Sequence, residues 1–331
     1  MSKPIISIII PCYNSRNTII HTLDSVFNQI KISENEYEVV VIDDCSKDGT
    51  LNLVKKSFKT KELSHVKLLS LSKNRGVSFA RNIGIHHSSG DWIVFLDSDD
   101  ELNREALSHI HSYVCGDYKA CDLLAFGYEV ITKKFRKDYT AHSYGNQVFL
   151  GNEFIKLFLS KKINLHISAM AYKKSFLINQ KILFKDGQKI AEDLCFIIKC
   201  LNYAKNIFYS EYKLFKYQVF NSTAMKQYEY YTLDMAKSVL ELSELVSDLH
   251  SDENKQFFDF YLVNFFAYNL LLIRKSRRVS KNAAKLLLAN LPILKKKIYP
   301  LNLTRYIFLR LIQVFPVRLY IEYRLGRKIG C

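Results

Sequence analysis

Acidic residues gather at three places where a strand is expected to end or a helix to begin. They are Asp43 and Asp44, then Asp97, Asp99 and Asp100, and finally Glu192 and Asp193. In open α/β sheets, ligands bind outside the carboxyl ends of the strands, so we expect the first two groups to share one edge. Carboxylates gathered there repel one another unless a cation lies among them, and such oxygen ligands suit Mg²⁺ or Mn²⁺. A single aspartate would be explained by turn capping, but the run Asp-Ser-Asp-Asp holds more acids than a cap needs.

Apolar segments precede the first two acidic groups. Residues 5–10 and 38–42 are continuous apolar runs rich in β-branched side chains, as expected of strands buried on both faces. Two more strands are predicted at residues 66–71 and 92–96. Between these predicted strands, apolar residues recur at helical spacing over residues 17–27, 51–58 and 77–86. This alternation predicts βαβ units and an α/β fold whose mostly parallel central sheet is flanked by helices.

The rest of the chain is mixed and then helical. The sequence predicts a strand over 122–132, helices over 151–159 and 192–203, and a largely helical region from about residue 228. The 331 residues are 48% hydrophobic and 24% charged, which excludes a disordered chain and allows one large or two modest domains. The seven cysteines form no CxxC pair, so we expect reduced, mostly buried thiols and no zinc site.

We expect no secretory leader and no membrane span from this sequence. The N-terminal apolar run, residues 5–10, is too short for a secretory leader. No stretch reaches about 18 nearly uncharged apolar residues, and the closest, residues 257–273, contains Asp259 and two asparagines. We therefore expect a cytoplasmic protein.

The net charge of +16 is concentrated at the C-terminal end. Residues 274–331 hold 15 lysines and arginines and one acid, Glu322, whereas the preceding residues are nearly neutral. Residues 301–325 interleave arginines with aromatic and aliphatic side chains, and Pro316 should break or kink any helix there. Such a segment suits an anionic bilayer surface, where basic residues contribute about 1 kcal/mol each. The alternative is a helical bundle with a charged outer face. Nucleic-acid binding is not expected, because no binding motif accompanies the charge.

Five segments resemble the sequence blocks of glycosyltransferase family 2. They are residues 7–14 (SIIIPCYN), 41–50 (VIDDCSKDGT), 74–84 (NRGVSFARNIG), 90–100 (GDWIVFLDSDD) and 191–196 (AEDLCF). The resemblance covers roughly residues 4–224. It implies a GT-A fold and an inverting transfer of a sugar from a nucleotide-sugar, usually a UDP-hexose or UDP-N-acetylhexosamine. Residues 1–224 would then be the catalytic domain, with a nucleotide-binding half over 1–100 and an acceptor-side half over 101–224. Residues 225–331 would be a helical, basic extension.

The resemblance also assigns residues to the nucleotide. These are Pro11, Tyr13, Asn14, Asp43, Asp44, Arg81, Asp97 and Ser98. Asp44 resembles the carboxylate that accepts a hydrogen bond from uracil N3–H. Arg81 resembles an arginine that packs on the base, although a solvated helix residue would be the plain alternative.

Metal and catalytic roles follow from the same resemblance. Asp97 and Asp99 form the Asp-x-Asp motif, in which Asp99 binds Mn²⁺ or Mg²⁺ while Asp97 holds ribose or shares the metal. The cation would offset the charge that develops on the departing diphosphate. Asp193, with Glu192 adjacent, resembles the base that takes the proton of the acceptor hydroxyl. Without the family pattern, both acids could simply favour the first turn of a helix.

Two positions depart from the family pattern. Cys45 stands where glycine is frequent, which a turn should tolerate. Residues 216–223 (KYQVFNST) lack the histidine that many members carry, so the sequence does not identify a third protein ligand for the metal.

The predicted function is a metal-dependent, inverting glycosyltransferase of bacterial surface polysaccharide such as capsule, lipooligosaccharide, lipopolysaccharide or O-antigen. Its partners would be a UDP-sugar donor, a glycan acceptor of the lipid-linked type that many members extend, and the inner face of the cytoplasmic membrane through residues 274–331. A nucleotidyltransferase is the alternative enzyme, but a glycine-rich phosphate loop should then follow the first strand, where residues 11–15 (PCYNS) lie instead. A non-catalytic membrane scaffold of the same fold is the other alternative, and the intact Asp97, Asp99 and Asp193 argue against it.

Overall fold

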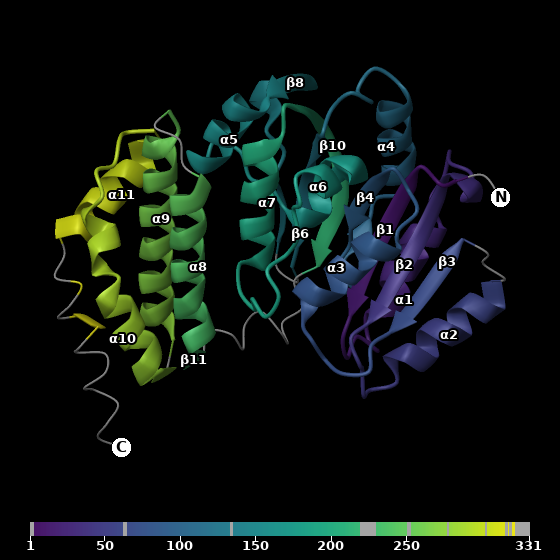
Figure 1. Ribbon diagram of the computed structural model, residues 1–331, viewed down its shortest axis with the longest axis horizontal. Helices are drawn as coiled ribbons and strands as arrows, with labels where there is room; N and C mark the ends of the chain where they lie inside the picture. Colours follow the sequence, from purple (N-terminus) through teal and green to yellow (C-terminus); the bar gives the residue numbers. More distant parts are fainter. Residues whose placement is uncertain are drawn as a thin grey trace. The chain divides into compact units, whose positions relative to one another are not determined.

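The chain forms two compact units in the computed structural model (Figure 1). The first consists of residues 1–154 and 164–219, and the second of residues 155–163 and 220–331. The structure describes residues 3–61, 65–132, 135–218, 230–249, 253–276, 278–301, 303–314, 317, 320 and 321. The expected domain boundary at residue 224 lies outside these described residues and stays a prediction.

The first unit is built around one twisted sheet flanked by helices (Figure 1). Its strands are β1 (Ile6–Cys12), β2 (Tyr37–Asp43), β3 (Val66–Ser70), β4 (Trp92–Phe95), β5 (Glu101–Leu102), β6 (Leu123–Ile131), β7 (Arg136–Asp138), β8 (Gln147–Leu150), β9 (Met170–Lys173) and β10 (Asn206–Gln218). Its helices are α1 (Ile19–Phe27), α2 (Thr50–Lys61), α3 (Val77–His87), α4 (Ala106–Cys115), α5 (Gly151–Leu159), which continues into the second unit, α6 (Lys174–Asn179) and α7 (Glu192–Tyr203). Short 3₁₀ turns occur at η1 (Glu34–Glu36), η2 (His142–Tyr144) and η3 (Ile167–Ala169).

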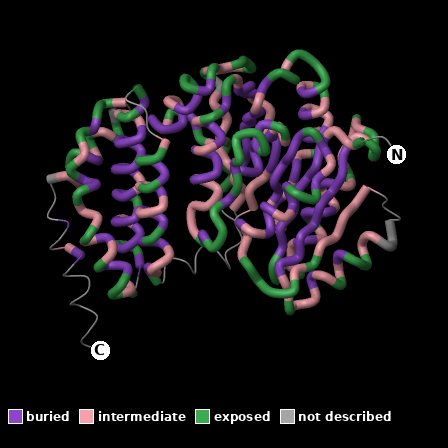
Figure 2. Tube along the Cα trace, in the orientation of Figure 1, coloured by how far each residue is buried: buried purple, intermediate pink, exposed green. Residues whose placement is uncertain are grey.

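The strand order is β3-β2-β1-β4-β9-β6-β10-β5. Strands β3, β2, β1 and β4 are parallel, which confirms the predicted βαβ units and mostly parallel sheet. Every residue of β1 and β2 is buried, as the apolar runs predicted (Figure 2). In register, Cys12 pairs with Asp43, so the loops after β1 and β2 leave the sheet at the same edge.

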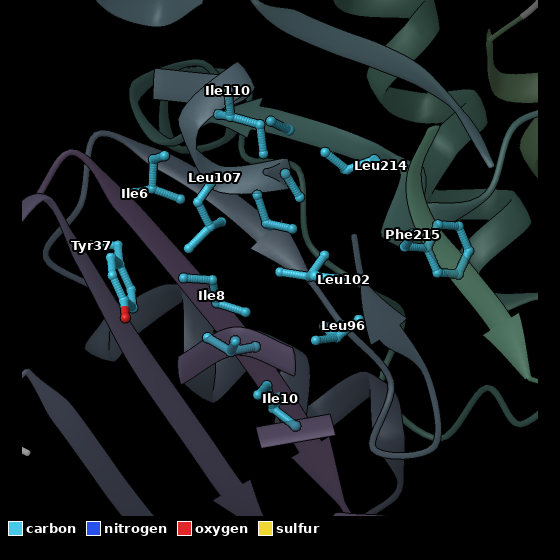
Figure 3. Close-up of a cluster of buried hydrophobic side chains, with 14 of the residues drawn as sticks. Ile6, Ile8, Ile10, Tyr37, Leu96, Leu102, Leu107, Ile110, Leu214 and Phe215 are labelled. Atoms are coloured by element: carbon cyan, nitrogen blue, oxygen red, sulfur yellow. The ribbon is translucent and has the colours of Figure 1, made fainter. Parts of the chain in front are cut away.

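Alternate residues of β1 pack on opposite faces of the sheet. Ile6, Ile8 and Ile10 belong to a hydrophobic cluster that includes Leu107 and Ile110 of α4 (Figure 3). The opposite face, with Ile9, lies against α3. A side chain at Gly84 of α3 would clash with Ile9 and come within 3.1 Å of Ile42 Cδ1. Glycine there lets α3 approach the sheet closely, and this approach brings Arg81 of the same helix to the carboxyl ends of the strands.

Antiparallel pairing in the second half of the sheet brings distant residues beside β4. Strand β9 pairs antiparallel with both β4 and β6, and β6 pairs parallel with β10. The sequence predicted β6, but β9 was missed because its four residues carry no alternation long enough to recognise. This short strand places η3, and His166 before it, next to the acidic residues that follow β4.

The second unit is helical. Its elements are β11 (Tyr230–Tyr231), α8 (Leu233–Leu249), α9 (Lys255–Lys275), β12 (Arg278–Val279), α10 (Lys281–Ala289), the 3₁₀ turn η5 (Leu291–Lys295) and α11 (Leu303–Val314). Strands β11 and β12 form a separate parallel pair. The helices confirm the predicted helical character of this region.

Helix α9 corrects one expectation from the sequence. By length and composition it is apolar enough to cross a membrane, whereas no span was expected from the sequence over residues 257–273. Most of that window, 61%, is buried inside the protein, and the core helix of a soluble protein passes the same test. Its polar side chains are bonded within the unit. Asp259 pairs with Lys296 at 2.5 Å, Asn264 accepts from Arg305 at 3.0 Å, and Asn269 accepts from Tyr231 Oη at 2.7 Å.

The basic region is in part a packed structural layer. Ile293 and Leu294 of η5 and Leu309 of α11 are buried within the second unit. On another side of α11, Ile307 and Leu311 are 53% and 63% exposed, one helical turn apart. Arg318 and Arg324, which belong to the interleaved segment 301–325, lie outside the described residues together with Pro316.

Replacement of Gly84 by alanine should destabilise the first unit. The added methyl group overpacks the contact of α3 with Ile9 and Ile42, and we expect the free energy of unfolding to fall by about 1–3 kcal/mol. His86→Ala, at an exposed position of the same helix, is the control and should change stability by less than about 0.5 kcal/mol. Urea unfolding measures both. Equal stability of the two variants would show that α3 does not rest on the sheet this closely.

Candidate active site

A cavity of about 300 Å³ opens at the carboxyl ends of β1, β2 and β4. It is lined by Pro11, Cys12, Tyr13, Ser15, Asp44, Val77, Ala80, Arg81, Asp97, Ser98, Asp99 and Glu192. Most residues predicted from the sequence to bind nucleotide and metal therefore line one space, although 181 positions separate Pro11 from Glu192. The predicted residues Asn14, Asp43 and Asp193 are not among the described residues that line it. The parallel strands explain this convergence, because their carboxyl ends meet at one edge of the sheet.

Arg81 links two of the acidic groups. Arg81 is only 3% exposed. One terminal nitrogen of its guanidinium donates to Asp97 Oδ1 at 2.7 Å, and the other donates to Glu192 Oε1 at 3.2 Å. The sequence resemblance gave Arg81 a role in packing on the base, and this role stays a prediction. The ion pairs with Asp97 and Glu192 were not foreseen, because they join residues of three different elements.

Asp44 is held by backbone amides of the loop before α3. Its Oδ1 accepts from Arg75 N–H at 2.8 Å and its Oδ2 from Gly76 N–H at 2.7 Å. Each carboxylate oxygen can accept a second hydrogen bond, so the side chain keeps capacity for a ligand. Asp43 is also buried, and its Oδ2 accepts from Ser46 N–H at 3.2 Å.

The loops after β1 and β2 each hold a non-glycine residue in left-handed backbone conformation. Cys45 has φ of +64°, which explains why glycine suits this position and implies a local cost of about 1 kcal/mol. Asn14 has φ of +50°, and its Oδ1 accepts from Lys47 N–H at 2.9 Å. Asn14 thus ties the loop after β1 to the loop after β2, while Tyr13 beside it is 48% exposed at the cavity.

The three aspartates after β4 differ in environment. Burial acts to raise the pKa of Asp97, but the charge and hydrogen bond of Arg81 hold it below its usual value. Burial, with the charge of Asp97, raises the pKa of Asp99 to about 6. Burial raises the pKa of Asp100 further, and the charges of Asp97 and Asp99 add to this shift. The charge of Asp97 therefore makes both Asp99 and Asp100 harder to ionise.

Asp100 is the most enclosed of the three. It has no exposed surface, and its Oδ1 accepts from Gln218 N–H at 3.0 Å, whereas Oδ2 has no hydrogen-bond partner among the described residues. One oxygen each of Asp97 and Asp100 and one imidazole nitrogen of His166 lie within 4.8 Å of one another. Crowded carboxylates with an unsatisfied buried oxygen fit the neighbourhood of a divalent cation. This cluster does not include Asp99, whose assignment as a metal ligand stays a prediction.

His166 was missed by the sequence analysis. No spacing rule connects it to Asp97, which lies 69 positions earlier, and a lone histidine gives no signal. Its place depends on the pairing of β9 with β4, because η3 leads directly into β9.

The predicted catalytic pair begins α7. Ala191 before it has φ of +59°, a left-handed conformation that turns the chain into the helix. Burial, with the charge of Asp193, raises the pKa of Glu192 to about 7, although Arg81 opposes the shift. Asp193 is half-buried, and its Oδ1 accepts from Leu194 N–H at 2.7 Å. Both acids thus lie at the helix start, and only Glu192 contacts Arg81.

Comparison with solved structures identifies the fold as the GT-A type, as predicted. The structure of Staphylococcus aureus TarS 1–349 with UDP-GlcNAc superposes with a TM-score of 0.59, at 22% identity, over 82% of this chain and 84% of that one. The structure of the mannosyltransferase PcManGT from Pyrobaculum calidifontis, in complex with GDP-Man and Mn²⁺, superposes with a TM-score of 0.60 at 17% identity. This superposition covers 98% of this chain and 85% of that one. At these identities the likeness shows the fold alone.

Sequence comparison defines the family. Residues 7–183, more than half of the chain, match the family model of glycosyl transferase family 2, and the chain belongs to this family. A relative is the poly(ribitol-phosphate) β-N-acetylglucosaminyltransferase TarP of Staphylococcus aureus, which is 33% identical over 213 residues. That alignment covers 61% of this chain and 58% of TarP, so the matched region spans little more than half of the relative.

Replacement of Asp100 by asparagine should stabilise the protein in a pH-dependent way. An acid whose folded-state pKa is raised favours folding while it is protonated, and this contribution is lost as pH rises through the folded pKa. In metal-free buffer, the unfolding free energy of Asp100→Asn relative to that of wild type should therefore increase from pH 5 to pH 8. Urea unfolding at both pH values gives this difference.

The control is Asp117→Asn, which neutralises an exposed acid of the same unit. Its effect should stay within about 0.5 kcal/mol at both pH values. A gain for Asp100→Asn that does not change with pH would contradict the raised pKa.

Proposed function

We propose that this chain is a glycosyltransferase that moves a sugar from a UDP-sugar to a hydroxyl of a bacterial surface glycan, with inversion and with the help of a divalent cation. The observation that carries the proposal is the convergence of Asp44, Arg81, Asp97, Asp99 and Glu192 on one cavity. Family membership supports it. The names of TarP, and of TarS with its bound UDP-GlcNAc, favour a UDP-hexose or UDP-N-acetylhexosamine donor and a cell-surface acceptor.

The nucleotide would occupy the part of the cavity between the loops after β1 and β2. Asp44 has a free acceptor position on each oxygen and would take the uracil N3–H. Pro11, Tyr13 and Ser98 line the same space, and exposed Tyr13 offers an aromatic face. Asn14 and Asp43 would act by holding the loops, because their side chains accept hydrogen bonds from backbone N–H groups of the turn after β2.

Asp97 and Asp99 would hold the cation, Mn²⁺ or Mg²⁺. When bound, the ion supplies the positive charge that the departing diphosphate requires. Among the described residues that line the cavity, Arg81 is the sole cation, and its charge is already shared by Asp97 and Glu192. The excess of carboxylates over cations in the cavity supports the need for a metal. Without a metal, we expect these carboxylates to repel a diphosphate, so that it binds poorly.

Asp193 would take the proton of the acceptor hydroxyl as the new bond forms. Inversion needs the acceptor on the face of the sugar opposite the diphosphate, so the base must lie across the sugar from Asp97 and Asp99. Arg81 supports this arrangement, because it bonds Glu192, the neighbour of Asp193, and Asp97 at once. The same guanidinium would therefore fix the distance between the leaving-group side and the acceptor side.

The two acids Asp99 and Asp193 provide a matched test. Asp99→Asn should abolish metal-dependent UDP affinity, whereas Asp193→Asn should bind the UDP-sugar almost like wild type and turn over about 10²–10⁴ times more slowly. Calorimetry with UDP and Mn²⁺ and an assay of UDP release measure the two properties. Because both variants make the same change of charge, each controls for the other. Loss of donor affinity at unchanged turnover in Asp193→Asn would place Asp193 in the donor pocket and refute its role as base.

We also propose that the second unit binds the anionic surface of the cytoplasmic membrane. Ile307 and Leu311 form an exposed apolar face on α11, next to the exposed Arg310, in a region with 15 basic residues and one acid. Basic residues would attract the lipid headgroups, while the two apolar side chains enter the layer below them. This arrangement supports a peripheral protein whose acceptor is lipid-linked.

Vesicle sedimentation tests the membrane proposal. Wild-type protein should sediment with phosphatidylglycerol-containing vesicles at low salt, ignore neutral ones, and be released by high salt. The double variant Ile307→Ser, Leu311→Ser should bind at least tenfold more weakly, since each buried side chain contributes about 1.5–3 kcal/mol. The control is Ile178→Ser, Leu183→Ser, an exposed apolar pair of the first unit. Equal binding by all three proteins would refute this surface.

A further inference from the structure

The proton position of His166 is fixed by its own local structure. The imidazole Nδ1 accepts a hydrogen bond from Ser168 N–H at 3.2 Å, which caps the turn η3. A peptide N–H is always a donor, so the Nδ1 lone pair must point at it. The neutral ring then carries its proton on Nε2 and presents a donor there.

The ring is held in place by aromatic side chains. Its centroid lies 4.8 Å from Phe215, 5.2 Å from Tyr217 and 5.7 Å from Tyr128. Because its Nδ1 accepts from Ser168 N–H, the ring is neutral in this arrangement. A fixed, neutral donor of this kind suits a neutral acceptor, such as a sugar hydroxyl or an amide carbonyl.

His166 lies beside Asp97 but is not part of the described cavity lining. Asp97, Asp99 and Glu192 line the cavity that suits the nucleotide, whereas His166 is not among the described residues that line it. Its imidazole nevertheless lies within reach of Asp97, and the charges of Asp97 and Asp193 both act on it. In the proposed reaction the sugar must lie between the diphosphate at Asp97 and the base Asp193. A side chain close to both acids therefore flanks the sugar.

We propose that His166 contacts the transferred sugar and donates its Nε2–H to a sugar oxygen, and that it is not a ligand of the metal. Metal ligation through Nε2 would need that nitrogen unprotonated, and the proton would then move to Nδ1, where it would face the N–H of Ser168. This proposal rests on the proposed function, which supplies both the sugar of the UDP-sugar donor and the base Asp193.

Two variants of His166 separate the roles of its two nitrogens. Asparagine places its polar atoms near the position of Nδ1, so His166→Asn keeps the acceptor for Ser168 but loses the Nε2 donor. Glutamine reaches the position of Nε2, so His166→Gln keeps the donor and loses the cap. We expect His166→Asn to lower the affinity for the UDP-sugar about three- to tenfold relative to UDP, and His166→Gln to stay within about twofold of wild type.

The measurements are calorimetric affinities for UDP with Mn²⁺, and for UDP-GlcNAc, UDP-GalNAc, UDP-glucose and UDP-galactose. The affinity for Mn²⁺ in the presence of UDP, followed by the spin resonance of the free ion, should stay within about twofold in both variants. His109→Asn is the control, because His109 stacks on Tyr212 with ring centroids 3.8 Å apart and does not belong to the cluster of Asp97, Asp100 and His166. It should change none of these affinities.

Each other outcome has a distinct meaning. Loss of Mn²⁺ affinity in both variants would make His166 a metal ligand and overturn the proposal. A normal affinity for the UDP-sugar in His166→Asn, together with a lowered one in His166→Gln, would show that His166 acts only as a structural cap of η3. That outcome would also overturn the proposal. If wild-type protein bound no uridine nucleotide in the presence of Mn²⁺, the proposed function itself would fail, whatever the variants did.

Discussion

The buried guanidinium of Arg81 is the interaction on which the site depends. A charge that is 3% exposed is stable only if it is paired, and Arg81 is paired with Asp97 after β4 and with Glu192 at the start of α7. The sheet edge and the helix are thereby held at a fixed separation. Because Arg81 lies on α3, one turn before Gly84, the close packing of that helix on β1 sets the position of the guanidinium. The packing of α3 in the core therefore also determines the geometry of the site.

The site has more carboxylates than its own cation can neutralise. Asp99, Asp100 and Glu192 all have raised pKa values, in each case chiefly because burial disfavours the ionised form. A protein without a cationic ligand has to tolerate this cost, and the binding of a divalent ion would relieve it. The same crowding that lowers stability would thus provide affinity for the metal. This trade-off is common where carboxylates are placed for chemistry rather than for packing.

The helical unit shows why residue composition alone does not define a membrane protein. Helix α9 is apolar enough to span a bilayer, yet Asp259, Asn264 and Asn269 each find a partner elsewhere in the unit. In lipid such side chains would be costly unless they were bonded. The exposed pair Ile307 and Leu311 on α11 is a better candidate for contact with lipid, because nothing described in the unit covers it.

The sequence by itself determined the βαβ half of the fold and the acidic residues at its strand ends. Buried parallel strands are continuous apolar runs, and the acids that follow them are local features of the chain, as are the family's sequence blocks. Only the tertiary structure decided the partners of Arg81, the enclosure of Asp100 and the place of His166. These depend on the antiparallel pairing of β9 with β4 and on the left-handed turn at Ala191. Neither leaves a periodic signal, because a four-residue strand and a single backbone angle are set by packing that joins distant parts of the chain.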